Sequence, residues 1–196
     1  MKKLHAVACF VLVLSACGGT DDADDQATVD NAAPTPPAAV PDATPPLGDP
    51  EIAHIAVTAN MLDAETGELA KGKAQNAEVK QFAERMVTDH TSANKEANAL
   101  AQKLSLTPSD NATSQQLKTD HDRVKAELEG KSGADFDRAY IANEITMHQN
   151  VLNALDQTLI PNAQNAELKA LLQKVRPLID SHLQMAQQIQ TKLGTQ

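Results

Sequence analysis

Three histidines in this sequence stand where an amphipathic helix would carry apolar side chains. Steps of about 100° per residue place them on the apolar faces of three segments. His90 lies in 77–104, His148 in 134–160 and His182 in 165–193. Imidazole nitrogens bind transition metals, and they also form hydrogen bonds inside protein cores. One such histidine would favour a core hydrogen bond, but three on different helices make a metal site an equal alternative.

Carboxylic acids accompany the histidines. Glu144 precedes His148 by about one helical turn, and Asp137 falls on the same face. Glu65 lies at the edge of the apolar stripe of the segment 51–74. An unpaired buried carboxylate costs several kcal/mol, so these groups need partners. The sequence therefore predicts that a divalent transition metal, or a network of hydrogen bonds, joins six residues: His90, Glu144, His148, His182, Asp137 and Glu65.

The turn between the last two long helices decides which of these residues can meet. A hairpin centred on Pro161 places His182 level with Tyr140, which is ~12 Å from the height of His148 at 1.5 Å per residue. One mononuclear site could not then include both histidines. This register predicts two groups, one of His182, Asp137, Tyr140 and Glu144 and the other of His148 and His90.

Four long segments carry apolar residues at spacings of three and four: 51–74, 77–104, 134–160 and 165–193. This spacing indicates amphipathic helices that bury one face. A shorter helical segment, 112–129, can carry the chain back along the bundle between the second and third of them. The strings Asn76-Ala-Glu-Val-Lys80 and Asn165-Ala-Glu-Leu-Lys169 open the second and fourth helices, which suggests two related hairpins. The predicted fold is an all-α, ferritin-like four-helix bundle with a helical crossover.

The first residues have the pattern of a secretion signal. Two lysines precede an apolar run, 6–14, that is far shorter than the ~20 residues of a membrane-spanning helix. The next residues, Leu14-Ser-Ala-Cys17-Gly18, resemble the lipobox of bacterial lipoproteins. That resemblance implies removal of residues 1–16, a lipid on Cys17 and, because Gly18 is not Asp, sorting to the outer membrane. The alternative is an ordinary signal peptide that leaves a free thiol.

The composition changes near residue 50. Residues 17–50 are rich in Pro and Asp and contain neither Lys nor Arg, so we expect a disordered, semi-extended tether. Residues 51–196 contain the helical patterns and form the predicted domain. The expected location is the bacterial cell envelope, where the lipid on Cys17 would hold the bundle on the outer membrane, facing the periplasm.

Three motifs together resemble a known family. They are Phe82-Ala-Glu-Arg-Met-Val-Thr-Asp-His90, then Phe136-Asp-Arg-Ala-Tyr140 followed by His148, and last Pro177 followed by His182. The combination is similar to the ferritin-like domain-of-unknown-function family four-one-four-two, many of whose members are labelled outer-membrane proteins. The resemblance covers nearly all of residues 51–193. It implies a ferritin-like bundle in the cell envelope and no particular reaction.

The composition excludes some functions and leaves three. A net charge of −9 and 2% aromatic residues argue against a nucleic-acid partner. Di-iron ferritins carry Glu-x-x-His on two helices, and the segments of His90, His148 and His182 lack this spacing, which makes an enzyme less favoured. The first hypothesis is an envelope lipoprotein that binds a transition metal without catalysis. The alternatives are a structural or stress-related module that binds an unidentified protein, and a dinuclear-metal oxidase or peroxide-handling enzyme.

Overall fold

The computed structural model describes residues 47–194, and within this range it contains helices and no strand. Five long helical segments make up the domain. They are α1 (Asp49–Lys73), α2 (Ala77–Lys103), α3 (Ala112–Glu129), α4 (Gly133–Ala154) and α6 (Ala166–Leu193). A π-helical turn, Leu155–Leu159, and the short α5, Ile160–Asn162, prolong α4. The predicted all-α class and all five predicted helices are confirmed, with ends that differ by no more than about two residues.

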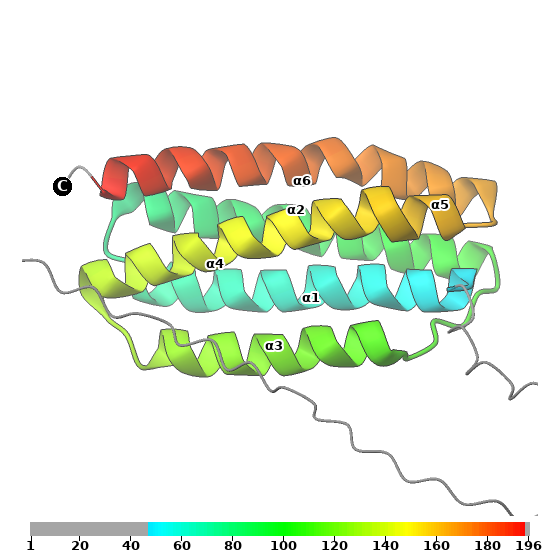
Figure 1. Ribbon diagram of the computed structural model, residues 1–196, viewed down its shortest axis with the longest axis horizontal. Helices are drawn as coiled ribbons and strands as arrows, with labels where there is room; N and C mark the ends of the chain where they lie inside the picture. The colour runs from blue at the N-terminus through cyan, green and yellow to red at the C-terminus, as the bar shows by residue number, and fades with distance from the viewer. Residues whose placement is uncertain (1–46, 195–196) are drawn as a thin grey trace, which may run out of the picture. The chain divides into compact units, whose positions relative to one another are not determined.

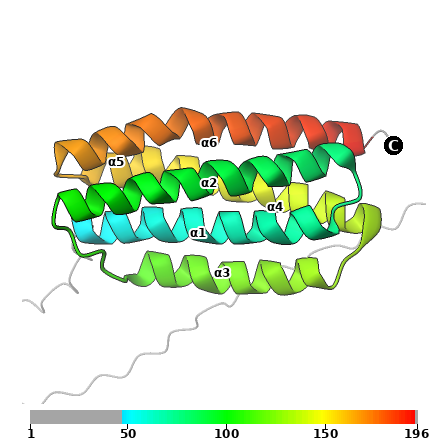
Figure 2. The same cartoon turned by 180° about the vertical axis from the view of Figure 1, so that it is seen from behind.

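The helices form two hairpins and a returning helix. Helices α1 and α2 pack side by side, as do α4 and α6, and α3 lies against α1 on the outside of the bundle (Figures 1 and 2). Helix α3 carries the chain back along the length of α1. As a result, helices α2 and α4 run in the same direction (Figure 1). None of the described helices combines the length and the apolar character that crossing a membrane requires.

The two hairpins begin their second helices in the same way. The Asn76 side chain accepts hydrogen bonds from the first N–H groups of α2, and Asn165 does the same for α6. The loop before each of these helices also binds a carboxylate of the other hairpin. The Asp137 carboxylate accepts from the N–H groups of Gln75 and Asn76, and the Asp49 carboxylate accepts from those of Gln164 and Asn165. The repeated strings in the sequence therefore correspond to a repeated local structure.

Two apolar clusters fill the bundle. One contains Phe82, Met86, Phe136 and Ile141, and the other contains Ile55, Leu152, Leu172 and Ile179. Buried polar residues interrupt the apolar faces of the four central helices where one cluster gives way to the other. On α4, for example, Glu144 and His148 lie between Ile141 and Leu152. The bundle thus places a polar layer between two apolar ones.

Candidate metal centre

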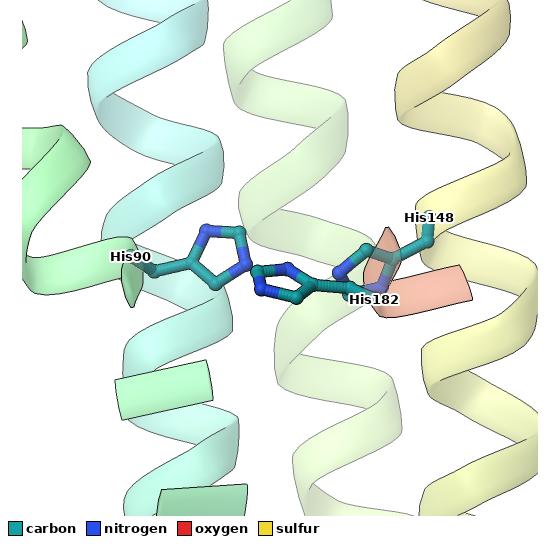
Figure 3. A group of neighbouring side chains, drawn as sticks. All are labelled: His90, His148 and His182. Carbon is teal, nitrogen blue, oxygen red and sulfur yellow. The ribbon is translucent and has the colours of Figure 1, made fainter. Parts of the chain in front are cut away.

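Three histidines from three helices meet in the polar layer. His90 of α2, His148 of α4 and His182 of α6 are all buried, with at most 4% of each residue exposed. Their ring centroids lie 5.3, 5.4 and 5.7 Å apart. One ring nitrogen of each lies within 4.8 Å of one ring nitrogen of the other two. Figure 3 shows the three rings turned toward one another.

Each imidazole is fixed by a hydrogen bond at one of its two nitrogens. The bonds run from His90 Nδ1 to Asn60 Oδ1 (2.9 Å), from His148 Nδ1 to the Glu144 carbonyl oxygen (2.8 Å) and from His182 Nε2 to Asp89 Oδ2 (2.9 Å). All three partners are acceptors, so the imidazole N–H must point to them. The Asn60 amide nitrogen donates to the Ala56 carbonyl at 2.9 Å, which turns the amide oxygen toward His90.

The other nitrogen of each ring has no hydrogen-bond partner among the described residues. These atoms are His90 Nε2, His148 Nε2 and His182 Nδ1. Burial lowers the pKa of His90 and of His182 to about 4, and it also lowers the pKa of His148. The three rings are therefore neutral at pH 7, and each keeps an unshared electron pair at its unpartnered nitrogen. A metal ion requires this state of an imidazole ligand.

Asp63 of α1 adds a carboxylate to the three imidazoles. Its Oδ2 lies 3.3 Å from His90 Nε2 and 3.7 Å from His148 Nε2, and only 2% of the residue is exposed. Burial raises the pKa of this carboxyl to about 6. At neutral pH Asp63 is mostly ionised and can serve as a fourth ligand.

Asp63 was missed by sequence reasoning, which chose Glu65 on the same helix. The helical pattern of the sequence does place Asp63 on the buried face. Steps of ~100° per residue put it only ~20° from Ile52 and Ala70, which are both buried. Glu65 points elsewhere: its side chain is 46% exposed and forms ion pairs with Lys125 and, at 3.5 Å, with His121. Glu65 therefore does not belong to the group of core residues.

Asp137 is the second predicted residue that lies away from the histidines. It is buried as expected, but its two oxygens accept the backbone hydrogen bonds from Gln75 and Asn76 described above. A carboxylate that already accepts two N–H groups has its charge compensated without a metal. Asp137 thus joins α4 to the loop before α2.

Glu144 lies beside the centre with His148 and Asp63. Its Oε2 is 3.6 Å from His148 Nδ1 and has no hydrogen-bond partner among the described residues. Complete burial and the nearby negative charge of Asp63 raise the pKa of Glu144 well above its ordinary value. The raised pKa favours the neutral acid form of Glu144.

The structure brings together one group of histidines where two were predicted. The error lies in the turn: Pro161 belongs to α5, and the chain reverses at 163–165. Moving the turn by three residues shifts the facing positions of the two helices by six, or ~9 Å at 1.5 Å per residue. His182 therefore lies at the height of His148 and not of Tyr140.

Comparison with known proteins identifies the family. Residues 32–189 match the family described as Domain of unknown function (DUF4142), and the chain belongs to it. No curated protein matches the sequence. The family's description assigns no activity.

Two solved structures share the fold. One is the crystal structure of a DUF305 protein from Streptomyces coelicolor that is described as secreted, with a TM-score of 0.60 and 10% identity over 74% of this chain and 92% of that chain. The other is CopM in its Cu(II)-bound form, with a TM-score of 0.59 and 16% identity over 75% of this chain and 98% of that chain. Both likenesses concern the arrangement of the helices.

Proposed function

We propose that this DUF4142 protein binds a divalent transition metal ion through His90, His148 and His182, with Asp63 as the fourth ligand. One observation carries the proposal. Three buried imidazoles each bind an acceptor through one nitrogen and leave the other without a partner, and one ring nitrogen of each lies within 4.8 Å of those of the other two. Metal-binding histidines are held in this way, because the hydrogen bond at the far nitrogen sets the tautomer and the orientation of the ring.

Three imidazole nitrogens and one carboxylate oxygen suit Zn²⁺ and Cu²⁺. The general order of affinities favours Cu²⁺ over the other divalent ions of the first transition series. CopM, whose helices are arranged similarly, has been solved with Cu(II) bound. Copper is therefore the first metal to test, followed by zinc.

The role that we propose is binding without catalysis, in a bundle of the ferritin-like kind. A dinuclear enzyme would need two sets of ligands, but the second group of acidic and histidine side chains, Asp63, Glu144 and His148, shares Asp63 and His148 with the four proposed ligands. One Glu-x-x-His string, Glu51 to His54, opens α1. Its histidine faces Asp110 at 3.6 Å, away from the three core histidines.

We also propose that the protein is lipid-anchored in the cell envelope. The support is the lipobox-like sequence that ends in Cys17 and the tether that follows it. The lipobox-like sequence and residues 17–46 of the predicted tether lie outside the described residues, and α1 begins at Asp49. The structural likeness to a protein described as secreted is consistent with a place outside the cytoplasm.

Metal titration of the purified protein tests the function. A ligand that binds only the native state stabilises it by ~2.7 kcal/mol at a hundredfold excess over Kd. For a domain of this size we expect a rise in Tm of about 5–10 °C with Cu²⁺ or Zn²⁺. His148→Ala should abolish that rise, and His121→Ala, which changes a histidine outside the centre, should preserve it.

The alternative function makes a different prediction. If the histidines serve only as a hydrogen-bond network, Cu²⁺, Zn²⁺, Mn²⁺, Fe²⁺ and Ni²⁺ should leave the Tm unchanged. His148→Ala should then still destabilise the protein by about 1–3 kcal/mol, because it leaves buried polar groups without partners. That pair of results would reject the metal centre in favour of the structural module.

A further inference from the structure

A cavity of ≈ 390 Å³ lies between α1, α3, α4 and α6. Most of its wall is apolar, formed by side chains such as Ile55, Leu62, Leu117, Val151, Leu155 and Leu159. Cavities of about 300–1,000 Å³ with apolar walls and a few polar groups are typical of small-molecule sites. The cavity is large enough to bind more than the metal ion alone.

The polar end of this cavity is the metal centre itself. Asp63, His90 and His148 line the cavity, and three of their atoms, Asp63 Oδ1, His90 Nε2 and His148 Nε2, have no hydrogen-bond partner among the described residues. An ion bound by these residues would be accessible from the cavity. Cu²⁺ prefers tetragonal coordination, so a copper ion held by the four protein ligands can accept a fifth ligand from the cavity side.

We infer that the metal centre binds an exogenous small molecule, an aliphatic monocarboxylate whose carboxylate lies on the metal ion and whose hydrocarbon tail fills the cavity. This inference rests on the proposed metal-binding function and adds a ligand class to it. The carboxylate would lie at the polar end of the cavity. The hydrocarbon tail, which needs no hydrogen bonds, would contact the apolar wall.

Charge and size define this class. Asp63 is the one carboxylate among the proposed ligands, so a divalent ion keeps one uncompensated positive charge. The other charged residues of the lining, Asp120 and Arg123, form an ion pair with each other. An anionic headgroup compensates that charge in a medium where electrostatic attraction is strong. One water molecule needs about 10–15 Å³ of such space, so a cavity of ≈ 390 Å³ has room for more than a dozen heavy atoms. Decanoate fits within it.

Helix α3 forms one wall of the cavity. Leu117 and Val124 face the cavity from α3, and His121 of the same helix meets Thr66 Oγ1 of α1 at 3.3 Å. Few side chains hold α3 in place, since only Ser114 and Leu128 of this helix are buried. Exposed residues, among them Thr113, Asp120 and Asn150, also line the cavity, so a ligand can reach it from solvent.

Decanoate and the metal-loaded protein provide the test. After Cu²⁺ binding has been measured, decanoate is titrated into the Cu²⁺ protein by calorimetry, and the visible Cu²⁺ absorption band is recorded at each addition. We expect one decanoate per protein and a shifted band. Metal-free protein with decanoate, and Cu²⁺ protein with 1-decanol, should each bind at least about tenfold more weakly, because each pair lacks the ion–carboxylate contact.

Two variants of α4 provide a matched pair. Ala154→Phe adds a ring to the cavity wall, and Ala142→Phe makes the same change at an exposed position of the same helix. Each buried methylene contributes a factor of about four to affinity, so a ring that displaces two of them should weaken decanoate binding by about tenfold or more. Ala142→Phe should bind decanoate as the parent does, and both variants should bind Cu²⁺ normally.

The possible failures are distinguishable. No Cu²⁺ or Zn²⁺ binding would reject the proposed function and this inference together. Normal Cu²⁺ binding without decanoate binding would overturn the inference alone and would make the cavity an access route for the ion. Equal decanoate binding with and without metal, or an unshifted Cu²⁺ band, would show that the carboxylate does not lie on the metal, which also overturns the inference.

Discussion

For each histidine in the centre, the position of one proton decides whether the ring can bind a metal. Asn60, Asp89 and the Glu144 carbonyl hold the N–H groups on the outer sides of the rings, so the unshared pairs face inward. Apolar helix faces were enough to predict that His90, His148 and His182 are buried. The acceptors were not predictable in this way, because Asp89 adjoins His90 in the sequence but binds His182 in the fold.

The pH dependence of metal affinity tests these proton positions. Protons and metal ions compete for the same atoms, so affinity falls as each ligand protonates. The pKa of Asp63 is raised to about 6, and those of His90 and His182 are lowered to about 4. Zinc affinity should therefore be nearly constant above pH 7, fall by at most about tenfold per pH unit below 6, and fall more steeply toward pH 4.

Competition titrations with a chelator of known affinity measure this profile, at half-unit steps from about pH 4.5 to 8. Histidines in an aqueous environment would give a different result. Their pKa is about 6.5, so affinity would already fall steeply between pH 6.5 and 5.5, with several protons released per metal. That result would mean that the three rings are solvated.

The raised pKa of Glu144 leads to a second prediction at this scale. Glutamine has nearly the shape of a protonated glutamic acid, so Glu144→Gln should change the free energy of unfolding by less than ~1 kcal/mol. Glu144→Ala removes the side chain and leaves a void, which should cost about 2–4 kcal/mol. Urea unfolding of the metal-free proteins measures both values. Equal losses in the two variants would show that Glu144 is ionised and needs its charge.

At the scale of the helices, the elements were predictable and their register was not. Spacings of three and four, with Asn76 and Asn165 as caps, predicted the helices closely. The predicted turn was at Pro161, because a proline lacks the N–H that a helix interior needs. The helical segment instead continues past Pro161. The π-helical turn Leu155–Leu159 precedes it, and such a turn departs from the regular α-helical hydrogen bonds and accommodates the break. No local pattern of the sequence announces that turn.

Asp137 provides a prediction about how the two hairpins are joined. An asparagine at this position can accept only one of the two backbone N–H groups and turns a second donor toward the other, so Asp137→Asn should destabilise the protein by about 1–3 kcal/mol. Asp135→Asn is the control, because the Asp135 side chain is 80% exposed and forms a surface ion pair with Arg138. It should cost at most about 0.5 kcal/mol.

Urea unfolding and copper titration of both variants complete this test. Copper affinity should be unchanged in Asp137→Asn, because both carboxylate oxygens of Asp137 bind the loop before α2. A selective loss of copper affinity with normal stability would mean that Asp137 is a ligand after all.

For the whole molecule, the centre's position between two apolar clusters explains how a small bundle can hold so many buried polar groups. Each cluster packs one end of the four central helices, so the helices are fixed on both sides of the polar layer. The rings are then held at their positions before any metal arrives. Such preorganisation lowers the cost of binding, because the ligands lose little freedom when the ion enters.

The last prediction concerns the whole chain and its attachment. The lipobox-like sequence predicts a lipid on Cys17, and the residues between it and the bundle, 18–48, could span about 100 Å at ~3.1 Å per residue in a polyproline-like state. Mass spectrometry of the native N-terminus should find acylated Cys17 without residues 1–16. Cys17→Ser should leave the membrane fraction or remain unprocessed, because a thiol is needed to carry the lipid. Its copper affinity should match that of the parent, since all proposed ligands lie in the bundle. A Cys17→Ser protein that is still processed and still sediments with membranes would show that another feature of the chain holds it there.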